Sequence, residues 1–293
     1  MAGAPPPRLL ALPVIDMAAA AADEAAAAAA VRAACVGPGF FYVTNHGAEP
    51  LRGALFERTA TLFDAPLAAK LAMRAAPPLF RGYTPLQEET LDPASQTEGD
   101  TKEGFYFGRD VPAGSAEAAL PLHGPNAWPP EALAPGFRAA ATAYFEAARA
   151  LGFRLLRLLA LGLPAEHFHP SFARPMLFLR PLRYAPVASR PDAGLLGAGA
   201  HTDYGMLTLL ATDGVPGLQI RQEGGWLGVP PLEGALIVNL GDLLERCGGL
   251  LRQQGGGRAA AAPHSPRASP LLTCAQPVAD GQTGDSDQHC TGW

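Results

Sequence analysis

A histidine and an aspartate one residue apart are the side chains best suited to metal chemistry in this chain. His201 and Asp203 follow a glycine-rich loop, residues 197–200, and precede an apolar, strand-like stretch, residues 206–211. Side chains two positions apart on a strand share a face, so this imidazole and carboxylate can be directed at one metal ion. Two histidines and one carboxylate form the facial triad that holds non-haem Fe(II) and leaves other coordination positions open. The pattern therefore predicts two of three iron ligands.

The spacing alone is weak evidence. The chain has seven histidines and 27 acidic residues, and one such pair arises by chance in about half of comparable chains. A surface histidine and aspartate at the edge of a loop would give the same pattern. The surrounding sequence has to decide between the two interpretations.

Several blocks around this pair follow one another in a recognisable order. They include Gly-Phe-Phe-Tyr-Val-Thr-Asn-His-Gly at 39–47, Asp-Thr-Lys-Glu-Gly-Phe-Tyr at 100–106 and Gly-Ala-His-Thr-Asp-Tyr-Gly at 199–205, with further blocks at 12–16, 81–85, 88–93, 121–126, 217–220 and 238–242. Together they resemble the isopenicillin N synthase-like branch of the Fe(II)/2-oxoglutarate-dependent oxygenases, and those from 81 to 126 resemble a plant-type subgroup. The resemblance covers residues 12 to about 246 and stops after Arg246.

The resemblance implies a cofactor, a co-substrate and site residues. Fe(II) would be held by His201 and Asp203 plus a distal histidine, and 2-oxoglutarate would be the co-substrate in the oxidation of a small organic molecule by O₂. Tyr184 resembles the tyrosine that hydrogen-bonds 2-oxoglutarate, although a core tyrosine with a satisfied hydroxyl is the alternative. In the family an Arg-x-Ser pair beyond the distal histidine holds the far carboxylate of 2-oxoglutarate.

The segment after Arg246 does not continue this pattern. Between Cys247 and Gly292 there is no Phe, Tyr, Trp or Ile, and glycine, alanine and proline are frequent. Such a composition lacks the apolar area that offsets the entropy of ordering, so we expect residues 247–293 to be a disordered tail. The resemblance places the distal histidine near Gly257, which is no ligand.

Other residues of the tail are weaker candidates for the missing groups. His264 has nearly the expected separation from Asp203, and Arg267-Ala-Ser269 imitates the Arg-x-Ser pattern. In the family, however, the gap between these two features is much longer, so coincidence in a Pro/Ser/Arg-rich segment is the expected explanation. The expectation is an impaired oxygenase, produced by a reading frame or splice junction that departs from the family after Arg246. The rivals are a working enzyme completed by His264 and an inactive isoform or pseudoenzyme that acts only through protein interaction or has no role.

The composition limits the partners and the cellular location that can be expected for this protein. A net charge of −5 argues against a nucleic-acid partner, because no basic patch is present to neutralise phosphates. No signal peptide or membrane segment is expected, and four cysteines without metal-like or secreted-module spacing indicate the cytoplasm. The expected partners are the small-molecule substrate and O₂. The chain is expected to be a monomer if it is soluble.

The expected fold is α+β, a double-stranded β-helix (jelly roll) catalytic core, truncated here, preceded by a mixed α/β lobe. The lobe would comprise residues 1–170, the partial jelly roll residues 175–246, and the tail residues 247–293. A 3.6-residue apolar period predicts a long bracing helix over 137–161, and an alanine run at 18–34 predicts one surface helix. Short strands are expected at 39–44, 176–184, 206–211, 217–221 and 236–240. Lys102 and Glu103 are expected to form a solvated ion pair.

Overall fold

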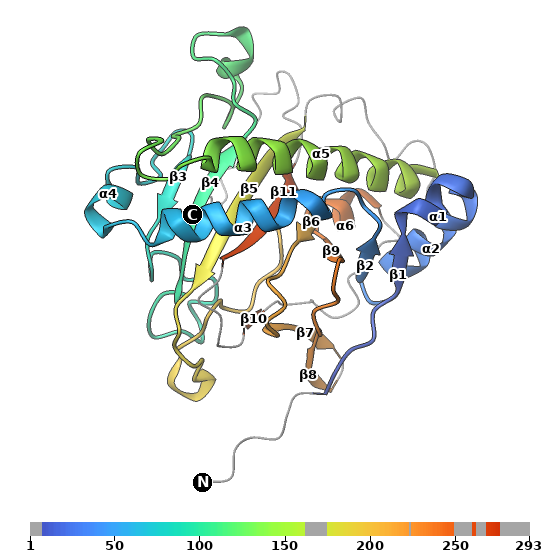
Figure 1. The fold of residues 1–293 in the computed structure, drawn as a ribbon. Helices are drawn as coiled ribbons and strands as arrows, with labels where there is room; N and C mark the ends of the chain where they lie inside the picture. The colour runs from blue at the N-terminus through green and yellow to red at the C-terminus, as the bar shows by residue number, and fades with distance from the viewer. Residues whose placement is uncertain (1–7, 162–174, 223, 249–259, 262–267, 276–293) are drawn as a thin grey trace, which may run out of the picture.

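Two β-sheets and a layer of helices make up the computed structural model, which describes residues 8–161, 175–222, 224–248, 260–261 and 268–275. The large sheet has eight strands in the order β1-β2-β9-β6-β11-β5-β4-β3, and the small sheet has three in the order β10-β7-β8 (Figure 1). All pairings are antiparallel except that of β1 with β2. The strands are β1 (Val14–Asp16), β2 (Phe40–Thr44), β3 (Gly82–Thr84), β4 (Lys102–Gly108), β5 (Met176–Tyr184), β6 (Leu207–Leu210), β7 (Leu218–Gln222), β8 (Gly225–Gly228), β9 (Leu236–Leu240), β10 (Ala260–Ala261) and β11 (Ala268–Ala275).

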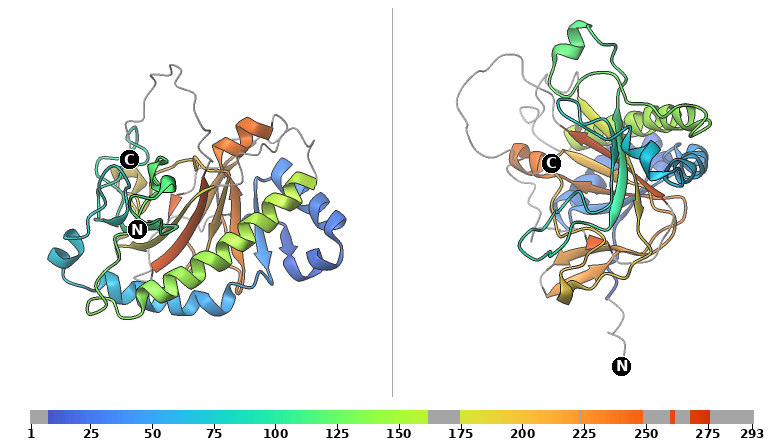
Figure 2. Two further views of the ribbon diagram at one scale, coloured as in Figure 1. Left: turned by 90° about the horizontal axis from the view of Figure 1, so that it is seen from above. Right: turned by 90° about the vertical axis from the view of Figure 1, so that its left-hand side faces the viewer.

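Helices cover the outer face of the large sheet (Figure 2). The longest, α5 (Phe137–Leu161), buries an apolar stripe that includes Phe137, Tyr144 and Leu155, and the predicted helix over 137–161 is thereby confirmed. This stripe belongs to the main hydrophobic core together with alternate residues of the strands, such as Leu179 and Val238. The other helices are α1 (Met17–Ala22), α2 (Glu24–Val36), α3 (Glu49–Phe63), α4 (Leu67–Leu71) and α6 (Asp242–Gly248), with short 3-10 helices at Ala116–Ala119 and Pro191–Ala193.

The inner face of the large sheet is turned toward the small sheet. A second apolar cluster joins Phe40, Tyr42 and Ile237 of the large sheet to Ile220 of β7. Because side chains alternate along a strand, the residues between those of the main core point to this interior. The interior is where a jelly roll holds its ligands, so the strand parity decides which side chains can reach a site.

The alanine run differs from its prediction in one respect, because it forms two helices rather than one. Asp23 separates α1 from α2, and its side-chain Oδ1 accepts a hydrogen bond from Ala26 N at 2.9 Å. An aspartate that caps the first turn of a helix satisfies an otherwise unpaired backbone N–H, so a new helix begins here. None of the helices in the described part of the chain is long and apolar enough to cross a membrane.

The tail contains two strands, contrary to the expectation of disorder for residues 247–293. β10 pairs with β7, and β11 lies inside the large sheet between β5 and β6. Residues 271–274 of β11 pair on both edges, which satisfies their backbone without help from aromatic side chains and explains how so plain a sequence can be a strand. The expectation of disorder is wrong for residues 260–261 and 268–275, and the rest of the tail beyond Gly248 lies outside the described residues.

β9, residues 236–240, keeps a partner on each edge without the tail. β9 pairs with β2 on one edge and with β6 on the other. Both neighbours precede Arg246 in the sequence, so β9 needs no strand from the tail. The facing edges of β5 and β6 do depend on the tail, because β11 lies between them and pairs with both.

Candidate metal centre

His201 and Asp203 lie together, but in a loop rather than on a strand. β6 begins at Leu207, four residues after Asp203. The shared strand face that motivated the prediction is therefore absent. The side chains still converge, with His201 Nε2 at 3.5 Å from Asp203 Oδ1, and they keep 25% and 20% of their surfaces exposed. Contacts with the glycine-rich loop and with two strands bring the two side chains together.

The imidazole of His201 is oriented by the backbone of the glycine-rich loop. His201 Nδ1 lies 2.8 Å from Gly199 O. A carbonyl can only accept, so Nδ1 carries a proton, and whenever the ring is neutral its Nε2 lone pair faces the side where Asp203 lies. Metal-ligating histidines nearly always donate their other ring N–H in this way, which fixes both tautomer and ring plane.

The carboxylate of Asp203 is held by the inner faces of two strands. Its Oδ2 accepts hydrogen bonds from Thr208 Oγ1 of β6 and, at 2.9 Å, from Asn239 Nδ2 of β9. Its backbone oxygen accepts from Asp242 N at 2.8 Å. Because Oδ2 is occupied, Oδ1 is the oxygen left to face His201, and a single carboxylate oxygen is oriented as a ligand.

The two groups shift one another's acidity. Burial lowers the pKa of His201, but the hydrogen bond and negative charge of Asp203 outweigh it and raise that pKa above 6.5. Burial raises the pKa of Asp203, and the contacts with His201, Asn239 and Thr208 outweigh it and lower that pKa below 3.8. The metal-free pair therefore favours an ion pair, in which a proton occupies the position that a cation would take.

The donor atoms of His201 and Asp203 are of the types that Fe(II) binds, and they make up two of the three expected ligands. One neutral imidazole nitrogen and one carboxylate oxygen, both pre-oriented and 3.5 Å apart, are two members of the two-histidine, one-carboxylate set that non-haem iron prefers. The described residues contain no group of three or more His, Cys, Asp or Glu side chains that could hold a metal. His264 and Arg267 lie outside the described residues. Ser269 is in β11, opposite Leu182 of β5.

Tyr184 ends β5 on its inner face. Leu177 and Leu179 belong to the main core, so the residues of opposite parity, Arg180 and Tyr184 among them, point to the interior. Burial raises the pKa of the Tyr184 hydroxyl to about 12, and the charges of several interior residues, including Asp203, also act on it. The hydroxyl is thus a neutral hydrogen-bond donor in the same interior as the candidate ligands His201 and Asp203.

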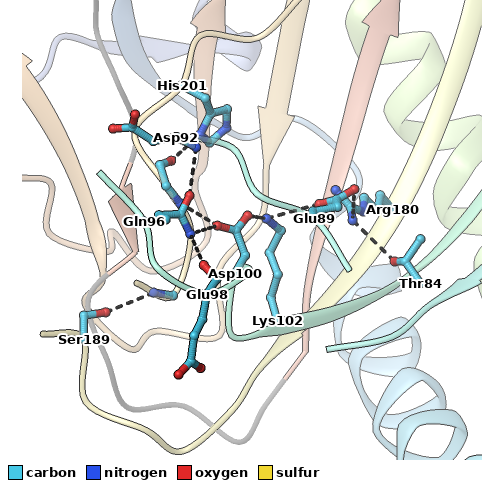
Figure 3. A network of polar contacts seen from close by, with 12 residues as sticks. Thr84, Glu89, Asp92, Gln96, Glu98, Asp100, Lys102, Arg180, Ser189 and His201 are labelled. Atoms are coloured by element: carbon cyan, nitrogen blue, oxygen red, sulfur yellow. Dashed lines mark hydrogen bonds and ion pairs between the residues drawn. The ribbon is translucent and has the colours of Figure 1, made fainter. Parts of the chain in front are cut away.

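A chain of buried charges that the sequence analysis did not identify crosses this interior (Figure 3). Lys102 Nζ is paired with Asp100 and, at 3.2 Å, with Glu89, and Glu89 Oε1 lies 2.6 Å from Arg180 Nη2. Asp100 Oδ1 accepts the N–H of Gly199, the residue whose carbonyl orients His201. We name these four residues, Asp100, Lys102, Glu89 and Arg180, the charge ladder.

The solvated ion pair expected between Lys102 and Glu103 is wrong. Both side chains are buried, with exposed fractions of 3% and 4%, and they lie on opposite faces of β4. Glu103 pairs on the helix side with Lys70 and Arg183. Two adjacent charges directly before a run of aromatic residues, as in residues 102–107, indicate that each charge has a partner on its own face of the strand.

Comparison with known proteins agrees with this geometry. Residues 12–131 match the family model described as the non-haem dioxygenase in morphine synthesis N-terminal, and residues 176–264 match the 2OG-Fe(II) oxygenase superfamily. The 2-oxoglutarate-dependent dioxygenase citB of Monascus ruber is 38% identical over 229 residues, which are 74% of this chain and 68% of that protein. Clavatol oxidase claD of Penicillium crustosum is 38% identical over 234 residues, 73% and 69% of the two chains.

Solved structures share the fold. The full-length Neurospora crassa protein crystallised with alpha-KG and thymine has a TM-score of 0.75 and 28% identity, covering 91% of this chain and 86% of that one. A 2OG-Fe(II) oxygenase family protein from Caulobacter crescentus has a TM-score of 0.75 and 25% identity, covering 91% and 87%. The family models, the relatives and the shared fold agree, and the chain belongs to the 2OG-Fe(II) oxygenases, a family that uses Fe(II) and 2-oxoglutarate.

Proposed function

We propose that this chain binds Fe(II) through His201 and Asp203 and binds 2-oxoglutarate beside Tyr184, to oxidise a small organic molecule. The observation that carries the proposal is the prior orientation of both ligand atoms, His201 Nε2 and Asp203 Oδ1, at 3.5 Å in a partly exposed interior. The iron with its bound co-substrate and O₂ supplies the oxidising chemistry, and the protein supplies binding and orientation.

Each residue of the site has a definite task in this proposal. Gly199 O keeps the proton of His201 on Nδ1 and leaves Nε2 free to bind. Thr208 and Asn239 occupy one oxygen of Asp203, so the carboxylate binds through the other. The Tyr184 hydroxyl stays neutral at physiological pH and can donate a hydrogen bond to a carboxylate of 2-oxoglutarate.

We further propose that turnover is impaired, because the family's C-terminal sequence is replaced after Arg246. The position at which the resemblance places the distal histidine is Gly257. Loss of an outer-shell partner already weakens metal affinity about 10–100-fold, so loss of a direct ligand should weaken it at least as much. A 2-oxoglutarate carboxylate without its arginine would also enter the interior unpaired, which is unfavourable.

The test has two readouts on the purified full chain. Anaerobic addition of Fe(II) and then 2-oxoglutarate should give a visible charge-transfer absorption, and release of CO₂ from 2-oxoglutarate in air should be slow but measurable. Both signals should disappear in His201→Ala and Asp203→Ala. If the folded wild-type protein gives neither signal, the oxygenase proposal is wrong and a non-enzymatic role is favoured.

A rival proposal is an intact site in which His264 is the third ligand. It is supported by the extent of the family match, which runs past Arg246 to residue 264. His264→Ala separates the two proposals. An unchanged charge-transfer band and Fe(II) affinity would exclude the rival, whereas loss of the band with the fold retained would establish His264 as a ligand. His289→Ala is the matched control, because His289 also lies in the tail.

A further inference from the structure

We infer that Asp100 is a positioning residue of the metal centre: through Gly199, it fixes the orientation and tautomer of His201. Asp100 lies just before β4 and 101 positions before His201 in the chain. Its side chain is fully buried and makes no direct contact with either ligand. The inference rests on a continuous path of hydrogen bonds from this carboxylate to the imidazole (Figure 3).

The path runs through one glycine. Asp100 Oδ1 accepts the N–H of Gly199 at 2.8 Å, and the carbonyl of Gly199 faces His201 Nδ1 at 2.8 Å. The N–H and the C=O lie on the two sides of the Gly199 Cα, and glycine is the residue type with the greatest backbone freedom. Without an anchor on the N–H, the carbonyl could rotate away, and the ring would lose the acceptor that keeps its proton on Nδ1.

Packing reinforces the anchor. A Cβ at Gly199 would lie 2.6 Å from Asp92 N and would collide with Gln96. Gln96 is itself fixed, since its Oε1 accepts from Asp92 N and its Nε2 donates to Asp100 Oδ1, both at 2.8 Å. The loop that carries Asp100 is therefore pressed directly against the residue that orients the imidazole.

The loop that carries Asp100 and the loop that carries Gly199 are joined by further hydrogen bonds along their length. Thr97 N donates to Gly194 O at 3.2 Å, Thr97 Oγ1 donates to Ala193 O at 3.0 Å, and Thr101 N donates to Leu196 O at 3.0 Å. These bonds set the general approach of the loops. Asp100 is distinguished from them because it alone, among these contacts, reaches Gly199.

Asp100 is the first member of the charge ladder. The ammonium of Lys102 lies against Asp100 Oδ2, and Lys102 also pairs with Glu89, which pairs with Arg180. Two cations and two carboxylates alternate along the charge ladder, so the buried charges compensate one another. Both oxygens of Asp100 accept hydrogen bonds, Oδ1 from Gln96 and Gly199 and Oδ2 from Lys102, so the carboxylate cannot turn without losing partners.

The closing experiment reads the tautomer of His201 directly. The protein is labelled with ¹⁵N-histidine and studied without metal, at a pH where the ring is neutral, and the His201 signal is assigned by its absence in His201→Gln. The wild type should show the Nδ1–H tautomer. Asp100→Ala should shift the ring toward a mixture with the Nε2–H tautomer and, in Co(II) titrations, weaken binding about 10–100-fold.

The control is Glu103→Ala, which deletes an equally buried carboxylate from the opposite face of β4, where it pairs with Lys70 and Arg183. It should lower stability and leave the His201 tautomer unchanged. If Asp100→Ala does not fold, Gly199→Ala separates the loops sterically and should give the same tautomer shift. A wild-type tautomer in both Asp100→Ala and Gly199→Ala, or an equal shift in Glu103→Ala, would overturn the inference.

The inference takes its meaning from the proposed function, but the two can fail separately. A chain that binds no metal at all would refute the oxygenase proposal and leave the tautomer result standing. A chain that binds metal equally well with and without Asp100, and with the same tautomer, would refute only the role of Asp100.

Discussion

Thr202 and Asp242 are 40 positions apart in the sequence, yet Thr202 Oγ1 donates a hydrogen bond to Asp242 Oδ2 at 2.9 Å. Thr202 stands between the two proposed metal ligands, and Asp242 is the first residue of α6, directly after β9 and Gly241. The backbone N–H of Asp242 also donates to Asp203 O. The loop that carries His201 and Asp203, which we call the ligand loop, is thus joined to the start of α6 by one side-chain and one backbone hydrogen bond.

Thr202→Val tests the side-chain half of this attachment. The replacement keeps the shape and removes the hydroxyl, so the free energy of unfolding should fall by about 0.5–1.5 kcal/mol. Metal affinity should also fall, because the residues on both sides of position 202 lose a constraint. Thr61→Val removes an exposed hydroxyl that bonds only within its own helix, and it should leave metal affinity unchanged. Equal metal affinity in the two variants would exclude the proposed constraint.

Asn239→Ala removes one of the two donors to Asp203 Oδ2. The pKa of Asp203 should rise toward its usual value, and the carboxylate should gain freedom to rotate. Metal affinity should fall about 10–100-fold, as for other outer-shell partners. Isothermal titration with Co(II) measures this loss. The matched control is Asn126→Ala, whose side chain bonds Gly108 at the far end of β4 and whose loss should be neutral for metal binding.

Much of the fold could be predicted because it depends on local patterns. The helix α5 has a regular apolar stripe, and β5 and β9 have the predicted limits of 176–184 and 236–240. β11 was missed because its stability comes from pairing with β5 and β6. Those strands are more than 50 positions away, and nothing in the composition of the tail indicates that a gap between them has to be filled.

The pair proposed as metal ligands could be named from sequence, but the groups that orient the pair could not. His201 and Asp203 are two positions apart and visible as a pair. Their supports come from positions with no regular spacing, such as Asp100 and Asn239, which meet them only through the sheet order. Lys102 was misjudged for the same reason, since its partner Glu89 lies 13 positions earlier, outside any strand or helix period.

The pH dependence of stability follows from the two shifted groups. The pKa of His201 is raised above 6.5 in the folded, metal-free protein, so its contribution is present below about pH 6.5 and lost as pH rises through the folded value. The pKa of Asp203 is lowered below 3.8, so its contribution is present above about pH 3.8 and lost as pH falls through the folded value. The pair should therefore stabilise the fold most between these limits.

Denaturant unfolding of the wild type and of His201→Gln at several pH values measures this difference. The gap between the two proteins should be widest between about pH 4 and 6.5 and should narrow on either side. Metal affinity should change in the opposite sense at the alkaline end, rising as His201 loses its proton, because a metal and a proton compete for Nε2. A gap that does not vary with pH would show that the two groups do not interact.

Gly241→Ala should be severely destabilising. A Cβ at this position would lie 2.8 Å from Asp203 O and would collide with Gly205 O, so β9 and the ligand loop could not keep their close approach. Thermal unfolding should show a loss of several kcal/mol, as expected when backbone must shift. Gly53→Ala in α3 is the control. That position has open space, and alanine in a helix is favoured over glycine by about 0.5–1 kcal/mol, so stability should rise slightly.

Leu272→Pro tests whether β11 occupies the centre of the large sheet. Leu272 pairs with Leu179 of β5 on one side and with Leu209 of β6 on the other. Proline has no N–H and cannot replace a ladder bond in a strand with neighbours on both edges. The variant should unfold at a much lower denaturant concentration, and the exposed edges of β5 and β6 should make it prone to aggregation. Leu86→Pro, at an exposed loop position, controls for the proline itself. If Leu272→Pro were as stable as the wild type, β11 would contribute nothing to the sheet, and residues 268–275 would behave as the composition of the tail predicts.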